Sequence, residues 1–149
     1  MTNIAFGYPC KLERQENGWW LARFPDVPEA LTEGESRDEA LESAKDCLIA
    51  ALEGYMKAGR PIPRPPFKGE RIVLPSLVTA KLSVYVNMQR LGWSKVKLAH
   101  ELGMPENSVR RLLDLRHSSH MWIIDEAMKK MNTELSIDLP RSLSRGQAA

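Results

Sequence analysis

The side chains that could support catalysis are spread along this chain in a pattern that does not favour it. Cleavage of a phosphodiester with two metal ions needs several carboxylates that converge on the metals. The acids of the first strand pattern, Glu13, Glu16 and Asp26, are instead interrupted by Arg14 and Arg23. The histidines lie in the second half with no evident cysteine or serine partner for nucleophilic catalysis. They are His100, His117 and His120. We therefore predict no catalytic residue, no metal site and no cofactor.

The two cysteines and the apolar pattern indicate the compartment. Cys10 and Cys47 are too few to hold a zinc ion by themselves, and we expect free thiols in a reducing cytoplasm. The first ten residues lack the basic start and continuous apolar run of a signal peptide. No stretch approaches the roughly 20 apolar residues needed to cross a bilayer. The sequence therefore predicts a cytoplasmic protein without a membrane partner.

The pattern of residues 98–116 indicates DNA binding instead of catalysis. Ala99 lies inside one expected helix and Gly103 at the turn into the next, as a tight crossing of two helices requires. With Val109 and Leu112 turned inward, the outer surface carries groups that bind guanine edges, adenine or phosphate. The alternative is a plain helical bundle with a basic face. The predicted DNA-binding residues are Lys95, Lys97, Pro105, Glu106, Asn107, Ser108, Arg110, Arg111 and Asp114.

The charges divide the chain into an acidic and a basic part. The formal net charge of +2 says little by itself. Acids dominate residues 29–53, whereas Lys and Arg lead residues 81–116, from Lys81 to Arg116. Two regions of opposite charge predict two different partners. The plainer alternative is that both regions are solvated helix faces.

The elements that position these groups begin with strands. Residues 7–14 and 19–24 flank a Glu-Asn-Gly turn and predict a β-hairpin. Pro25 and Pro28 then end the second strand, because proline cannot donate to a ladder. We expect a loop from there through Thr32 and Gly34.

A helix and one more strand complete the first module. Ser36 and Glu39 have the spacing of a capping box, so a helix begins there and ends near Gly59. After a proline-rich segment, residues 70–74 predict a strand beside the hairpin. The first module is therefore expected to be ββαβ.

Helix signals fill the second half. Ser94 and Ser119 are expected N-caps, and residues 134–139 alternate like a short strand. The expected helices cover residues 77–91, 94–102, 105–115 and 121–131. The expected domain boundaries are 1–75 for the first module, 76–139 for a helical DNA-binding and dimerisation domain, and 140–149 for a disordered tail.

This order of elements, with a proline-rich spacer between the modules, resembles the HicB antitoxins. Residues 26–35, DVPEALTEGE, are similar to the D-x-P-E-A-x-T-x-G-E loop of that family. Residues 110–112 and 134–136 resemble its helix-turn-helix branch. The resemblance implies an α+β chain: a partial RNase H-like module followed by an all-α Cro-type helix-turn-helix domain.

The resemblance also implies a partner, the small basic ribonuclease HicA. A toxin surface built for RNA is positive, so the acidic loop and helix can steer to it. Paired aromatics in a hairpin are more often core than interface, and we expect at least one of Trp19 and Trp20 in the core. The predicted toxin-binding residues are Trp19, Trp20, Asp26, Glu29, Glu33, Glu35 and Glu39.

The main hypothesis is a non-enzymatic antitoxin that inhibits a HicA-type toxin and represses its own operon. Helix-turn-helix proteins usually bind operator DNA as symmetric pairs, so we expect a homodimer or higher assembly through residues 121–131 and 134–139. One rival is a stand-alone helix-turn-helix regulator whose first module senses something other than a toxin. The other is an enzyme with a weakened RNase H-like site at Asp26 or Glu13.

Overall fold

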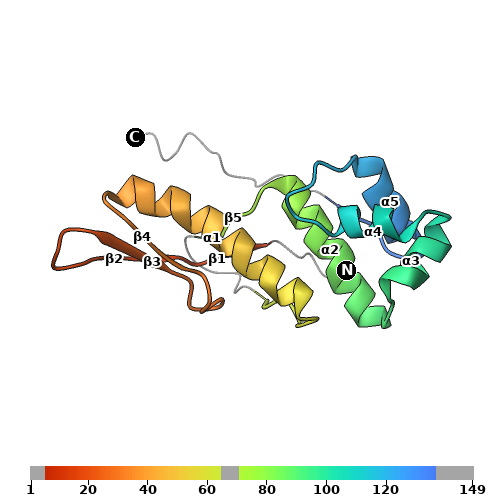
Figure 1. Cartoon of the computed structure of the whole chain (residues 1–149), viewed down its shortest axis with the longest axis horizontal. Coiled ribbons are helices and arrows are strands. Elements are labelled where there is room, and N and C mark those ends of the chain that lie inside the picture. Colours follow the sequence, from red (N-terminus) through yellow and green to blue (C-terminus); the bar gives the residue numbers. More distant parts are fainter. Residues whose placement is uncertain (1–5, 65–70, 137–149) are drawn as a thin grey trace.

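The computed structural model describes residues 6–64 and 71–136. Within these ranges four strands precede a long helix, and a fifth strand and four more helices follow (Figure 1). The expected mixture of strands and helices is confirmed. The elements are β1 Gly7–Tyr8, β2 Lys11–Arg14, β3 Trp20–Arg23, β4 Leu31–Gly34, α1 Arg37–Lys57, β5 Ile72–Val73, α2 Ser76–Leu91, α3 Lys95–Leu102, α4 Glu106–Leu112 and α5 Met121–Lys130.

The main sheet has three antiparallel strands in the order β2-β3-β4. Its third strand, β4, replaces the loop expected through Thr32 and Gly34. The two prolines are confined to consecutive tight turns, in which Val27 N–H donates to Phe24 O at 3.1 Å and Ala30 N–H to Val27 O at 2.9 Å. The chain is therefore free to form a ladder again directly after Ala30.

A second, two-stranded sheet pairs β1 with β5 in antiparallel register. The continuous first strand expected over residues 7–14 is interrupted at Pro9 and Cys10, because proline cannot donate to a ladder. The strand expected near residues 70–74 is present as β5 and pairs with β1, the first two residues of the expected hairpin, but not with β2 or β3. The first module is ββββαβ and not ββαβ.

Helix α1 lies along one face of the three-stranded sheet (Figure 1). Its predicted start is confirmed: Glu39 N–H donates to Ser36 Oγ at 3.1 Å. The Glu39 carboxylate accepts from Glu35 N–H at 2.9 Å, one residue before the position expected for a capping box. The helix ends at Lys57, before Gly59 with φ +66°. Its buried face consists of Ala40, Ala44, Leu48, Ile49, Leu52 and Tyr55.

The remaining helices gather at the end of the molecule opposite the β2–β3 hairpin (Figure 1). Ser94 caps α3 as expected, since its Oγ accepts from Lys97 N–H at 3.1 Å. The predicted cap at Ser119 is wrong: α5 begins after His120 without a side-chain cap. The helix expected over residues 105–115 is shorter, because α4 ends at Leu112.

One hydrophobic cluster runs through both halves of the chain. It includes Leu48 and Leu52 of α1 as well as Leu82 of α2 and Leu98 of α3. None of the helices within the described ranges combines the length and apolar character that a membrane crossing requires. Residues 134–136 form no strand, and the rest of the expected strand and tail lies outside the described residues.

Candidate functional site

Helices α3 and α4 pack against each other as a compact pair. Ala99 is buried at their crossing, and Gly103 takes φ +63° at the turn between them, so both predicted requirements of a tight crossing are met. Val109 and Leu112 are buried, as expected. This burial leaves Asn107 and Arg110 on the exposed side of α4.

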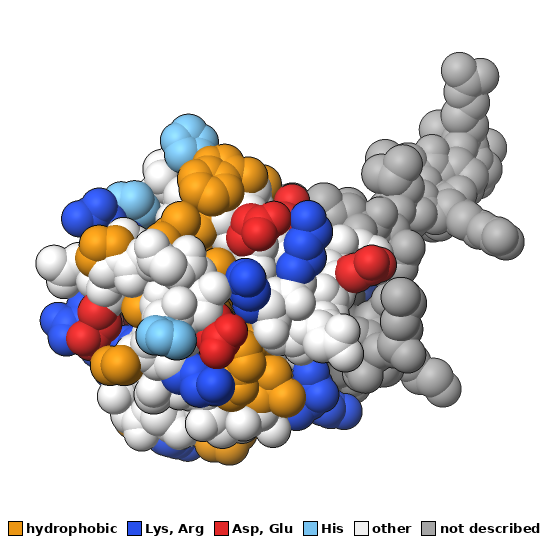
Figure 2. All heavy atoms as spheres, turned by 90° about the vertical axis from the view of Figure 1, so that its right-hand side faces the viewer, with side chains coloured by type: hydrophobic (Ala, Val, Ile, Leu, Met, Phe, Trp, Pro, Cys, Tyr) orange, Lys and Arg blue, Asp and Glu red, His pale blue; other side chains and the backbone are white. Residues whose placement is uncertain are grey.

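Each predicted DNA-binding residue is exposed except Ser108, which is half-buried. The charges over this end of the molecule are not uniformly positive, since Figure 2 shows Lys and Arg interspersed with Asp and Glu. Arg110 pairs with Glu106 at 3.1 Å, and Lys97 pairs with Glu101 at 3.4 Å. The ammonium of Lys97 also lies 5.0 Å from the ring centroid of Trp93. Both cations therefore have acidic neighbours on their own helices.

Lys81 differs from the predicted basic surface, because its side chain is fully buried. Its Nζ donates to Arg111 O at 2.9 Å, Leu112 O at 3.2 Å and Ser119 Oγ at 2.7 Å. Burial lowers the pKa of this ammonium, and the nearby carboxylate of Asp114 opposes that shift. Sequence reasoning missed this arrangement, although Lys81 lies three residues before Val84, on the apolar stripe of α2.

The predicted toxin-binding residues separate into two groups at opposite ends of α1. Glu33 and Glu35 are exposed just before the first turn of α1, and Trp20 pairs with Gly34 on the adjacent strand, directly after Trp19. Glu29 instead contacts the last turns of the helix. A helix of 21 residues is about 30 Å long, so the predicted set is not one patch.

Glu29 holds the proline-containing loop against the end of α1. Its Oε2 accepts from Tyr55 O–H at 2.5 Å and its Oε1 from Arg60 Nη1 at 3.0 Å. The hydrogen bond from Tyr55, helped by the Arg60 guanidinium, lowers the pKa of the Glu29 carboxyl. Both carboxylate oxygens therefore have partners within the chain, and Asp26 is half-buried in the same loop.

In the group beside the start of α1, the side chains differ in exposure. Trp19 is 40 % exposed, whereas Trp20 packs against the core, as expected for at least one of the pair. The Glu39 carboxylate is occupied by the helix cap. The freely presented groups are Trp19, Glu33 and Glu35.

The acidic and basic parts of the sequence meet in space. The guanidinium of Arg116, in the loop after α4, pairs with Asp46 Oδ1 at 2.6 Å and Glu53 Oε1 at 2.8 Å. Both carboxylates belong to α1. Arg116, from the basic part of the sequence, therefore neutralises two of the acids of α1 within the same chain.

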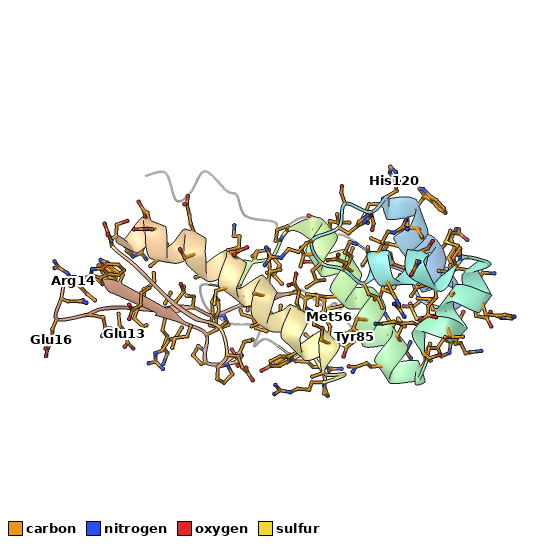
Figure 3. All side chains as sticks on the ribbon, in the orientation of Figure 1. Glu13, Arg14, Glu16, Met56, Tyr85 and His120 are labelled. Carbon is orange, nitrogen blue, oxygen red and sulfur yellow. The ribbon has the colours of Figure 1, made fainter. Side chains whose placement is uncertain are left out.

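The residues considered for catalysis are not brought together. Figure 3 shows Glu13 and Glu16 at the hairpin end and His120 at the opposite end of the molecule. Glu13 pairs with Arg23 at 2.7 Å. No cluster of three metal-binding side chains is found among residues 6–64 and 71–136. Cys10 and Cys47 are unbridged, and burial raises the pKa of the Cys10 thiol.

Comparisons with known proteins agree over most of the chain. Residues 7–83 match the family model described as HicB_like antitoxin of bacterial toxin-antitoxin system. The chain is 37 % identical to Antitoxin HicB 2 of Photorhabdus laumondii over 131 residues, which cover 87 % of this chain and 94 % of that protein. It is 32 % identical to Antitoxin HicB of Escherichia coli K12 over 133 residues, or 87 % and 96 % of the two chains. Antitoxin HicB of Pseudomonas fluorescens is 28 % identical over 142 residues, or 92 % and 96 %.

Proposed function

This chain belongs to the HicB-like antitoxin family, and we propose that it inhibits a HicA-type mRNA-cleaving toxin and represses its own operon by binding operator DNA. Residues 1–75 would neutralise the toxin and residues 76–139 would bind DNA and a second copy of the chain. The first module would be a partial RNase H-like fold without catalytic function, since Glu13 is engaged by Arg23.

The α3–α4 pair is the observation that carries the DNA-binding proposal. Lys95 and Lys97, at the start of α3, would meet phosphates, which gives affinity without sequence information. Asn107, Arg110 and Arg111 on α4 would then read base edges in the major groove. The pairing of Arg110 with Glu106 would orient the guanidinium before DNA arrives.

We propose that two copies assemble through α5. Met121 and Trp122, at its first turn, are 38 % and 57 % exposed, and large apolar side chains that gather on a surface favour contact with another protein. A pair of helix-turn-helix units is also what a symmetric operator requires. In this arrangement α5 buries Trp122 between the two copies.

The toxin surface proposed here is narrower than the sequence indicated. Trp19, Glu33 and Glu35 combine one exposed aromatic anchor with two exposed carboxylates, which suits a basic protein partner. Trp20, Glu29 and Glu39 would act through the shape of the surface, because their own groups are packed or paired within the chain.

Co-expression with the small reading frame beside the gene tests the toxin half of the proposal. We expect a stable complex that rescues growth from the arrest caused by the toxin alone. If no complex and no rescue are found, the stand-alone regulator with a different sensor role becomes the better description.

The DNA half is tested with Arg110→Ala combined with Arg111→Ala. We expect this pair to abolish specific binding to the promoter region in a gel-shift assay and to leave toxin neutralisation intact. Lys11→Ala with Arg14→Ala removes the same charge from the exposed strand β2 and serves as the control. Equal loss of DNA binding in both pairs would show that net charge, and not α4, determines affinity.

A further inference from the structure

Lys81 is a buried charge without a carboxylate partner. Its side chain is fully buried in α2, and no ion pair to it is found within the described part of the chain. A buried ammonium is costly unless its protons are hydrogen-bonded. All three protons of Lys81 have acceptors, two main-chain carbonyls and one hydroxyl.

The acceptors of Lys81 lie at the end of the proposed DNA-reading helix. The last carbonyls of a helix have no partner within it and carry partial negative charge. The carbonyls of Arg111 and Leu112 lie at this end of α4, and Lys81 reaches both from α2. The Arg111 carbonyl also accepts from Asp114 N–H at 3.2 Å. The third acceptor, Ser119 Oγ, lies at the far end of the loop that follows α4. One nitrogen atom therefore joins α2, the end of α4 and the loop before α5.

This connection matters because α4 is short. It has seven residues, too few for an isolated helix to hold its own geometry in water. Arg110 and Arg111 occupy its last turn, and the Arg111 carbonyl is itself an acceptor of Lys81. The direction in which these two side chains leave the surface thus depends on how the end of α4 is held.

We propose that Lys81 is a positioning residue of the DNA-reading surface, which it sets by holding the end of α4 and the following loop against α2. This inference rests on the proposed DNA binding by α4. In many proteins an apolar residue at such a buried position gives equal or greater stability, so stability alone does not explain a lysine here. The hydrogen bonds that hold the end of α4 in one position do explain it.

The test uses Ser119→Ala, which removes one acceptor of Lys81 together with the contact of Ser119 Oγ to His117 Nδ1 at 3.2 Å, alongside Lys81→Met, which removes all three bonds of the ammonium. Ser118→Ala is the matched control, because Ser118 is exposed in the same loop. Ser119→Thr restores a hydroxyl. Each full-length variant is titrated with promoter DNA at fixed salt, and amide hydrogen exchange of residues 106–119 is followed without DNA.

We expect Ser119→Ala to weaken promoter binding by about tenfold, the loss typical of one charge-assisted hydrogen bond, and to speed exchange at the end of α4. Lys81→Met should weaken binding further, whereas Ser118→Ala should match the unchanged chain. Ser119→Thr should recover most of the affinity. Toxin neutralisation should be unchanged in all four.

Two results would count against different claims. If Ser119→Ala and Ser118→Ala bind promoter DNA equally well, or if the loss merely follows the fraction of unfolded protein, Lys81 is not a positioning residue. If the unchanged chain itself does not bind its promoter, the proposed DNA binding fails first, and the DNA role of Lys81 fails with it.

Discussion

Two glycines of the first module have opposite steric surroundings. A Cβ on Gly34, at the end of β4, would lie 2.5 Å from Ala40 N and 2.9 Å from Ala40 Cα. These are backbone atoms of the first turn of α1, which the cap at Ser36 already fixes. A Cβ on Gly54, within α1, would meet nothing within 4 Å. The glycine of the DVPEALTEGE segment is therefore needed for close approach of strand and helix.

The two positions give a matched test of this account. Gly34→Ala should lower the free energy of unfolding by about 1–3 kcal/mol, because the strand must move away from the helix. Gly54→Ala should raise it by about 0.5–1 kcal/mol, since alanine is the better helix former at an open site. Urea denaturation followed by circular dichroism measures both. Effects of the same sign would contradict the close contact.

The pKa of Lys81 gives a second prediction at the scale of one residue. Because burial lowers this pKa in the folded state, the unfolded chain binds the proton more tightly. Burial of the charged Lys81 therefore lowers the free energy of unfolding. This cost is fully present at pH values below the pKa of Lys81 in the folded protein, and it is gone once the pH exceeds the pKa of lysine in the unfolded chain. The stability of the unchanged chain relative to Lys81→Met should therefore increase between neutral pH and about pH 10, near the unperturbed lysine value. Denaturation of both proteins at the two pH values checks this, and a constant difference would contradict it.

At the scale of elements, the helices were predictable because their ends carry local signals. Ser36, Ser94 and Gly103 act where capping rules expect them. The strands were less predictable, because pairing partners are distant in sequence. Gly7 and Val73 pair across 66 residues, and β4 follows two prolines that indicate a loop.

The candidate site was likewise predictable where it is formed by one local segment, and not where it depends on contacts that are distant in sequence. The outer face of α4 could be read from helical periodicity, since it is formed by one short segment. The acidic residues 29–39 are close in sequence, yet the extended strand β4 runs between Glu29 and Glu35, so these two acids lie toward opposite ends of α1. The sequence shows Lys81 only as one of the cations of the basic part, and its complete burial is not predictable from residue type, because lysine is rarely fully buried.

The remaining acidic surface makes a prediction for the element formed by β4 and the start of α1. Glu33→Lys with Glu35→Lys should weaken toxin affinity at least tenfold, because close charge pairs across an interface couple strongly. Glu29 and Glu39 are left unchanged, since altering them would also disturb the loop and the helix cap. Glu16→Lys with Glu42→Lys gives the same charge change on exposed acids outside β4. Calorimetry that finds equal affinities for the two pairs would exclude this surface.

At the scale of the whole molecule, the two halves are joined by specific contacts. Tyr85 of α2 donates to Arg60 O at 2.8 Å, and Gln89 Nε2 donates to Gly59 O at 3.0 Å, both just past the end of α1. Figure 3 shows Tyr85 at this junction. Because the Arg60 side chain also holds Glu29, the proline-containing loop is connected through Arg60 to α2.

The pairing of Arg116 with α1 tests how strongly the halves are coupled. Arg116, Asp46 and Glu53 are partly exposed, so each pair should contribute little, about 0.2–1 kcal/mol, and should weaken in salt. A double-mutant cycle of Arg116→Ala and Glu53→Gln should give an interaction free energy in that range in dilute buffer and close to zero in 1 M salt. The same cycle with Glu42→Gln, an exposed acid of α1 for which no pair to Arg116 is found among the described residues, is the control. An interaction free energy that persists in 1 M salt would mean that packing, rather than charge, joins the loop of Arg116 to α1. In that case the contact between this loop and α1 would persist even when a binding partner competes for the charges of Arg116, Asp46 or Glu53.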